Sequence, residues 1–281
     1  MTLRITVLVD NVTGGDPATL NWFFQGEYAL SMLVETEDRV ILFDTGLASA
    51  VVHNARLLGI DFSRIDTVVL SHGHEDHVGG LREVLRRTGP VDVVAHPSIW
   101  DVKYGKLGDV ERYVGIPFRR EELESLGARF LMSEDPVSIG KYALTTGEVP
   151  LITEYEQVDP ACCVKVDGML EPDPLADDLS LVVRTAEGLV VIMGCAHRGM
   201  INHLLRAREV TGEERIHAVV GGTHLSSASG QRISDTVKDL TAMAPSVIAP
   251  CHCTEFRGMS MLAHAFGDRF LEIHTSKSFE I

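Results

Sequence analysis

The chain has 281 residues and a formal net charge of −15, because 40 acidic side chains outnumber 25 basic ones. This balance argues against nucleic acid or an anionic membrane as the main partner, since both attract a basic surface. A small-molecule substrate remains compatible with it, even an anionic one, because bound cations can reverse the local field. The length allows one large α/β domain or two small ones.

Hydropathy and cysteine usage bear on the location of the protein. No run of about 18 apolar residues is present, so we expect no membrane-spanning helix. The N-terminal residues alternate polar and apolar like a strand and lack the basic start of a signal peptide. The five cysteines are an odd number, which favours reduced thiols over a disulfide framework. We therefore expect a cytoplasmic protein, and the sequence is compatible with a monomer or an oligomer.

The first elements alternate between strand and helix. Strands are expected at 3–9, 29–36, 40–43 and 66–70, and a helix at 49–59. Between the first two strands, a polar loop from Asn11 to Glu27 carries Trp22, Phe23 and Phe24. Such an aromatic-bearing loop is typical either of a lid over a cleft or of a segment whose aromatic side chains pack into the core.

The stretch Ser71-His72-Gly73-His74-Glu75-Asp76-His77 follows the strand at 66–70. It places three imidazoles and the carboxylate of Asp76 within six residues, and a polar loop has no other reason to collect imidazoles. Imidazole and carboxylate together suit zinc, iron or manganese. The cluster offers more ligands than one catalytic ion needs, because such an ion keeps a position open for water. The motif therefore predicts two metal ions that share a water.

The rest of the chain continues the alternation. A helix is expected at 79–88 and a strand at 91–95, followed by an insertion over 98–145 with a short helix at 119–126. After a loop at 168–178, a hairpin is expected from 179–185 and 189–193. Three units of strand, loop and helix follow, with strands at 189–193, 216–220 and 246–249. Each of these strands is followed by a loop that contains a histidine, namely His197, His224 or His252. We expect these imidazoles at one rim of a sheet.

The His72-x-His74-x-Asp76-His77 motif resembles the signature of the metallo-β-lactamase-fold superfamily. Further motifs are similar to a branch that includes archaeal dihydropteroate-synthase-like proteins of methanopterin biosynthesis and many bacterial hydrolases. These motifs are Phe43-Asp44-Thr45-Gly46, Gly147-Glu148, Gly194-Cys195-Ala196-His197, Gly221-Gly222-Thr223-His224-Leu225 and Pro250-Cys251-His252-Cys253. The resemblance implies a single α/β domain over 1–281. It would be an αββα four-layer sandwich with two mixed sheets face to face and helices outside.

The resemblance also implies ligand assignments. His72 and His74 would hold the first ion, and Asp76, His77 and His252 the second, with Asp44 beside the ions. The family's further histidine is replaced here by Glu148, and its bridging aspartate by Cys195. The third ligand of the first ion is thus left open among His197, Cys195 and Glu148, with neutral imidazole favoured. Zinc is the first expectation for the two ions, with manganese, iron and magnesium as alternatives.

The implied activity is hydrolysis, in which a metal-bound hydroxide attacks an ester, lactone or phosphate-type small molecule. Asp76 would orient the nucleophile, and His224 would donate a proton or steady an oxyanion, unless it only caps the next helix. One alternative is a synthase that joins a dihydropterin-type diphosphate to an aminobenzene ribose phosphate and releases diphosphate. Another is a non-enzymatic module that holds metal and binds an effector.

Overall fold

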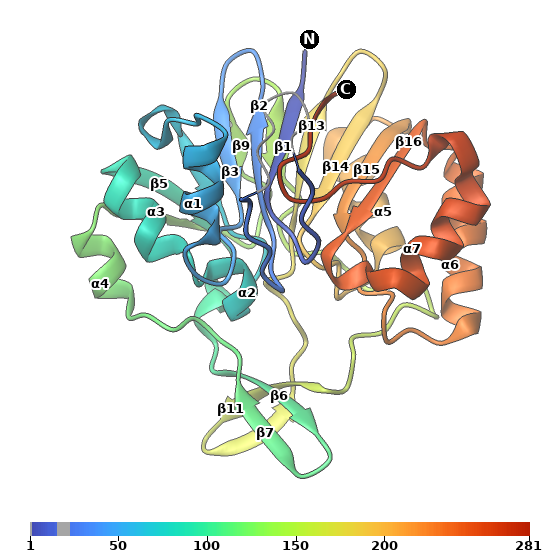
Figure 1. Ribbon diagram of the computed structural model, residues 1–281. Helices are drawn as coiled ribbons and strands as arrows, with labels where there is room; N and C mark the ends of the chain where they lie inside the picture. The colour runs from blue at the N-terminus through green and yellow to red at the C-terminus, as the bar shows by residue number, and fades with distance from the viewer. Residues whose placement is uncertain (1, 16–22) are drawn as a thin grey trace.

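The computed structural model describes residues 2–15 and 23–281. Two mixed sheets lie face to face at its centre, and helices cover the outer face of each, so the body has four layers (Figure 1). The first sheet has the strand order β17, β1, β2, β3, β4, β5, β8. Its strands in chain order are β1 Arg4–Val9, β2 Ser31–Glu35, β3 Val40–Phe43, β4 Thr67–Val69, β5 Val91–Ala95, β8 Ala128–Met132 and β17 Ser278–Glu280. The expected αββα sandwich is confirmed.

The second sheet has the strand order β16, β15, β14, β13, β10, β9. Its strands are β9 Ser138–Ile139, β10 Ala143–Thr145, β13 Ser180–Arg184, β14 Leu189–Met193, β15 Ile216–Gly222 and β16 Val247–Cys251. The expected hairpin is confirmed, because β13 and β14 pair antiparallel. The strands β14, β15 and β16 pair parallel, so their carboxyl ends lie at one edge of the sheet.

Helices connect the parallel strands on the outside of both sheets (Figure 1). The helices of the first half are α1 Ala50–Leu57, α2 Glu75–Val78, α3 Leu81–Thr88 and α4 Arg120–Ser125. Those of the second half are α5 Met200–Thr211, α6 Gly230–Met243 and α7 Glu255–Phe266. No helix in the described part of the chain is both long and apolar enough to cross a bilayer.

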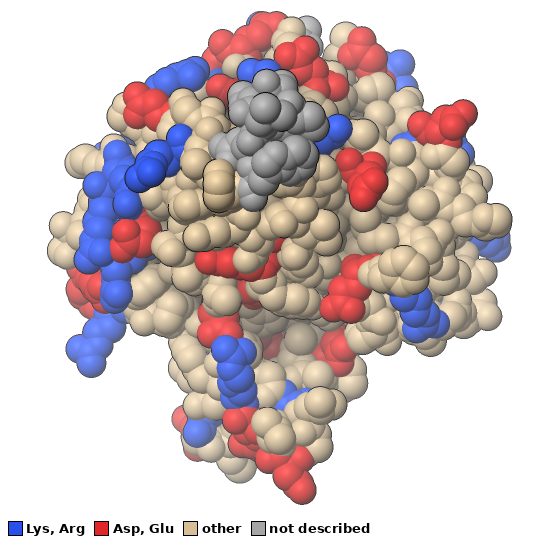
Figure 2. All heavy atoms as spheres, in the orientation of Figure 1, with Lys and Arg blue, Asp and Glu red and all other residues tan. Residues whose placement is uncertain are grey.

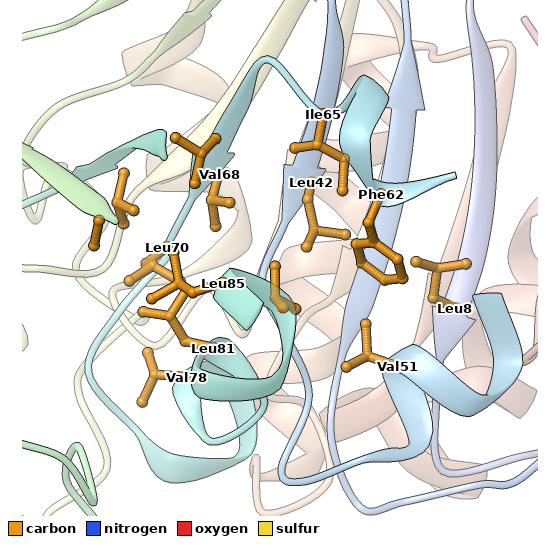
Figure 3. Packing of buried hydrophobic residues seen from close by; sticks show 14 of the residues in the cluster. Leu8, Leu42, Val51, Phe62, Ile65, Val68, Leu70, Val78, Leu81 and Leu85 are labelled. Atoms are coloured by element: carbon orange, nitrogen blue, oxygen red, sulfur yellow. The ribbon is translucent and has the colours of Figure 1, made fainter. Parts of the chain in front are cut away.

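Three apolar cores hold these layers together, and the alternation of side chains along each strand divides residues among them. Ile41 and Phe43 of β3 point into the core between the two sheets, whereas Leu42 between them faces the first helical layer. Figure 3 shows that outer core, where Leu42 lies among Val51 of α1, Phe62 and neighbouring apolar side chains. In the second sheet, Val191 of β14 packs toward the helices on the other side.

A small four-stranded sheet projects from the body as an arm (Figure 1). Its strand order is β12, β11, β6, β7, with β6 Lys103–Leu107, β7 Val110–Tyr113, β11 Cys162–Val166 and β12 Met169–Pro172. Two hairpins far apart in the sequence form it, because β6 pairs with β11. We use "arm" for these four strands.

The strand pairings correct two predictions. The range 98–145 is not a continuous insertion, because β8 adds to the first sheet and β9 and β10 add to the second. The range 168–178 is not wholly a loop, because β12 pairs with β11 within it. The partner of β8 is β5, which is distant in sequence, so local patterning carries no signal for that pairing. The strand β12 instead pairs with the preceding strand β11 across Asp167-Gly168, a local hairpin signal that the Pro- and Asp-rich composition of 168–178 concealed. The proposed lid at 11–27 stays a prediction, since Trp22 lies outside the described residues, whereas Phe24 is buried.

Candidate metal centre

The candidate ligands come from loops that follow strands of both central sheets. Residues 71–77 follow β4 of the first sheet. In the second sheet, Cys195 and His197 follow β14, His224 follows β15 and His252 follows β16. Because β14, β15 and β16 run parallel, their loops meet at one edge of the sheet, where α/β folds commonly keep their chemistry.

The backbone is strained at this edge. Asp44, Ala196, His224 and His252 have positive φ angles of 57°, 51°, 48° and 52°. A residue other than glycine costs about 1–3 kcal/mol in such a conformation, and it persists only where the surroundings impose it. Strain of this kind is concentrated at binding and catalytic sites, which makes this edge the strongest candidate for one.

Three histidines form the first ligand cluster. His72 Nε2 lies 3.0 Å from His74 Nδ1 and 3.2 Å from His197 Nε2. All three ligand nitrogens lie within 4.8 Å of one another, so they can converge on one ion. Glu148 instead forms an ion pair with Arg198 at 2.7 Å and belongs to no ligand group among the described residues. The geometry thus favours His197 over Glu148 as third ligand.

A second cluster contains one carboxylate and two imidazoles. Asp76 Oδ2 lies 3.6 Å from His77 Nε2 and 3.4 Å from His252 Nε2. His252 comes from the far end of the chain and reaches the 71–77 loop across the junction of the two sheets. This convergence of His252 with Asp76 and His77 is the arrangement that the sequence motifs predict.

Cys195 lies between the two clusters. Its Sγ is 3.2 Å from His77 Nε2, and it forms ligand groups with His72 and His77, with His197 and His224, and with His252 and Cys253. Burial, followed by the neighbouring Cys253, raises the pKa of the Cys195 thiol well above its usual value. A nearby cation is therefore needed to ionise it.

The protonation states of the candidate ligands fit metal binding except at His77. Burial lowers the pKa of His77, but Asp76 and Asp44 raise it to about 9, so a metal ion would have to displace a proton from this imidazole. Burial is the largest cause that lowers the pKa values of His72 and His197 well below the usual range, and that of His74 to about 4. These imidazoles are therefore neutral near pH 7, as ligation requires. Burial raises the pKa of Asp76, but the neighbouring His77 and His252 lower it further than burial raises it, so the carboxylate is ionised. His252 Nε2 is buried and has no hydrogen-bond partner among the described residues, as expected of a ligand atom.

His224 borders the first cluster. Its ring centroid lies 4.2 Å from that of His197, and its Nδ1 is buried with no hydrogen-bond partner in the part of the chain that the structure describes. The backbone N–H of His224 donates to Cys253 Sγ at 3.2 Å, which ties this loop to the one after β16. This ring nitrogen lies beside the candidate metal ligands, so it can form a hydrogen bond with a substrate or bind a proton.

Buried carboxylates hold the ligand loops, and the sequence analysis did not identify three of them. Asp44 accepts from Ser71, Asp177 from Gly73 N–H, Asp178 from Arg198 N–H and Asp10 from His252 N–H, at 2.7–2.8 Å. Only Asp44 was expected near the metals. Asp177 and Asp178 lie in a segment whose Pro- and Asp-rich composition is typical of a solvated loop, although both are fully buried. Burial of a charge depends on tertiary packing, so composition alone could not reveal it.

A cleft of about 460 Å³ opens above both clusters. Metal-ligand candidates form its floor, and Tyr104 and Arg112 of the arm, together with Tyr28, Ser226 and Ser227, are among its wall residues. Figure 2 shows acidic side chains where the arm joins the body, with few basic ones beside them. Such a cleft suits a small molecule better than a polyanion.

Comparison with known proteins adds an independent finding. Residues 25–196 match the family model of the metallo-beta-lactamase superfamily. The chain belongs to this superfamily. It is 30% identical, over 96% of both chains, to a 7,8-dihydropterin-6-methyl-4-(beta-D-ribofuranosyl)-aminobenzene-5'-phosphate synthase of Methanocaldococcus jannaschii. An uncharacterized protein of the same organism is 32% identical, over 97% of this chain and 98% of its own.

Solved structures of the superfamily agree with the fold. A crystal structure of a metal-dependent hydrolase of the beta-lactamase superfamily has a TM-score of 0.83 and 33% identity, with 99% of each chain covered. The superfamily fold suggests that divalent metal binds, and the His, Asp and Cys groups described above are where this member can hold it. The assignment of each side chain to a particular ion stays a prediction.

Proposed function

We propose that this superfamily member is a metal-dependent hydrolase of a small molecule with an ester, lactone or phosphate-type bond. The observation that carries the proposal is the meeting of two ligand clusters under one cleft, with Cys195 between them. His72, His74 and His197 would hold one divalent ion, and Asp76, His77 and His252 the other. When bound, two such ions polarise the attacked oxygen and make water a stronger nucleophile near neutral pH.

The donor set favours zinc. Imidazole suits zinc, copper, iron and nickel, and a thiolate selects the softer metals over magnesium or manganese. Cys195 therefore supports zinc first and iron second, with manganese and magnesium as weaker alternatives.

The side chains around the ions have separate tasks in this proposal. Asp76 is held as a carboxylate by His77 and His252, so it can accept a hydrogen bond from the attacking water and orient it. His224 has a buried Nδ1 with no partner and lines the cleft, so it can hold a proton for the leaving group or donate to a developing oxyanion. Tyr104 and Arg112 of the arm would contact the part of the substrate that does not react.

The cleft and the charge of the protein support a small partner. A polyanion such as nucleic acid needs a basic track along its backbone, and the net charge of −15 opposes one. Arg112 lines the cleft and could bind a single anionic group, although it already pairs with Glu75. The substrate would therefore be a compact molecule with at most a few negative charges.

The test is a substrate panel with the zinc-loaded protein. Chromogenic acyl esters, lactones and phosphodiesters are assayed before and after dialysis against a chelator. Turnover that disappears on chelation and returns with zinc supports the proposal, and His74→Ala should lower it by orders of magnitude because a ligand is lost. The matched control is His264→Ala, because His264 is an exposed histidine on α7. Activity of His74→Ala equal to that of this control would contradict the proposal.

A synthase is the second candidate, and the relative that is 30% identical over 96% of both chains motivates it. In this case the same ions would stabilise a departing diphosphate. Diphosphate release from a pterin diphosphate is measured with and without an arylamine acceptor. Release that requires the acceptor supports the synthase, and release without it supports hydrolysis. No activity together with less than one ion per chain would instead support a metal-holding module.

A further inference from the structure

Lys103, the first residue of β6, is fully buried between two aspartates. Its Nζ lies 2.9 Å from Asp173 Oδ2 and 2.9 Å from Asp177 Oδ1. The side chains are 0%, 2% and 0% exposed, so this triad carries one positive and two negative charges without access to water. Burial lowers the pKa of Lys103, but the two carboxylates raise it further than burial lowers it, so the ammonium stays charged.

The triad contacts the metal loop directly. Asp177 uses one oxygen for Lys103 and the other, Oδ2, to accept the N–H of Gly73 at 2.7 Å. Gly73 lies between His72 and His74, which are two of the three candidate ligands in the three-histidine cluster. The packing there is close, because a Cβ on Gly73 would clash with Ile99 O and would lie 3.2 Å from Lys103 Cε. The backbone between the two ligands therefore has little freedom to move while Lys103 is in place.

The same triad lies at the root of the arm. Lys103 begins β6, an inner strand of the small sheet, whereas Asp173 and Asp177 lie in the segment that follows β12, its edge strand. A second contact joins the arm to this loop, since Glu75 N–H donates to Val114 O at 2.8 Å. The arm and the 72–75 segment are thus linked through a buried ionic contact and a backbone hydrogen bond.

Burial of three charges calls for an explanation other than stability. An apolar replacement of a buried ion cluster is often neutral or stabilising, whereas removal of one partner leaves an uncompensated charge at high cost. Apolar side chains in place of the triad could not accept a hydrogen bond. The triad supplies the carboxylate oxygen of Asp177, which is held in one position and accepts the Gly73 N–H. Outer partners of this kind typically change metal affinity about 10–100-fold when removed.

We propose that Lys103 is a positioning residue for the His72–His74 ligand pair, and that it acts through Asp177 and the Gly73 N–H. Lys103 holds the Asp177 carboxylate in place, Asp177 fixes the backbone between the two histidines, and the arm is thereby coupled to the three-histidine cluster. The inference rests on the metal centre of the proposed function, but it does not depend on which reaction is catalysed.

The test measures zinc affinity by competition with a chromogenic chelator, in backgrounds that leave one cluster intact. With His252→Ala, which disables the second cluster, Lys103→Met should weaken the remaining site about 10–100-fold. With His197→Ala, which disables the first cluster, Lys103→Met should leave the remaining affinity unchanged. Lys106→Met is the matched control, because Lys106 is on the same strand and its ion pair with Glu111 is exposed. Equal loss in both backgrounds, or no loss in either, would overturn the proposal.

A second measurement works without metal, so it separates this inference from the proposed function. Hydrogen exchange of the Gly73 amide in the metal-free protein should speed up in Lys103→Met and not in Lys106→Met. If Lys103→Met does not fold, the variant Lys103→Met/Asp173→Asn keeps the net charge of the triad at −1 and replaces it in both experiments. Unchanged Gly73 exchange in a folded variant lacking Lys103 would overturn the proposal. A wild-type protein that binds no zinc would overturn the proposed function and leave the exchange result to decide the structural link.

Discussion

The carboxylate of Asp44 lies 2.7 Å from His77 Nδ1, and both side chains are fully buried. Asp44 also accepts hydrogen bonds from the backbone N–H and the hydroxyl of Ser71, each at 2.7 Å. An ionised carboxylate only accepts, so His77 Nδ1 carries the proton and Nε2 is directed at Asp76. Asp44 belongs to no ligand group of the described residues, which places it behind the metal site as an orienting partner.

This pair leads to the first prediction. Asp44→Asn replaces one acceptor oxygen by an amide that donates, so His77 can no longer keep its Nδ1 proton directed at it. We expect zinc affinity at the second cluster to fall about 10–100-fold, as is typical when the partner of a ligating histidine is lost. Chelator competition measures the effect. Asp66→Asn is the control, since Asp66 is exposed and its side chain accepts a hydrogen bond from Val40 N–H, away from the metal site. Equal affinities in the two variants would show that Asp44 does not orient His77.

The second prediction concerns the third ligand of the first ion. His197 lies within ligand distance of His72 and His74, whereas Glu148 is paired with Arg198. His197→Ala should therefore lose about one zinc per chain, because three protein ligands are the usual minimum for a catalytic zinc. Glu148→Gln should keep the full zinc content. Elemental analysis of the purified variants decides between them, and a loss of zinc in Glu148→Gln alone would reverse the assignment.

The sequence predicted the parts of this site that depend on local order. Strand alternation placed the loops after β4, β14, β15 and β16, and residue type marked their histidines as candidate ligands or, for His224, as a candidate proton donor. The sequence left the third ligand open among His197, Cys195 and Glu148 with the imidazole favoured, and only the fold shows that His197 lies beside His72 whereas Glu148 pairs with Arg198. The triad around Lys103 was missed for a similar reason. A lysine and two aspartates some 70 residues apart look like surface charges until packing buries them.

The third prediction concerns stability away from the site. Ala244 ends α6 with φ 52° and ψ 47°, and it is exposed. This left-handed conformation costs a residue with a Cβ about 1–2 kcal/mol, whereas glycine adopts it freely. Ala244→Gly should therefore raise the free energy of unfolding by roughly 1 kcal/mol after the entropy cost of glycine. Urea denaturation measures it. Ala242→Gly, at an exposed position in the last turn of the same helix, should instead lower it, by up to about 1 kcal/mol.

The fourth prediction is a pH dependence at the start of α5. Glu156 is buried, and its carboxylate accepts hydrogen bonds from Thr153 Oγ1 and from the backbone N–H groups of Ile201 and Asn202. Burial raises its pKa above the ordinary value of 4.5 and outweighs these hydrogen bonds, which lower it. A carboxyl whose pKa is higher in the folded protein stabilises it most below the unfolded pKa. That contribution is lost as the pH rises through the folded pKa.

The wild-type protein should therefore lose stability relative to Glu156→Gln as the pH rises from about 4.5 toward neutrality, because glutamine does not titrate. Urea denaturation of both proteins across this range gives the difference in unfolding free energy at each pH. The control is Glu154→Gln, two residues earlier and exposed, for which the difference should stay flat. The prediction fails if the difference in unfolding free energy between the wild type and Glu156→Gln does not change with pH, or if the wild type gains stability as the pH rises. Either result would show that the hydrogen bonds from α5 offset the cost of burying the charge.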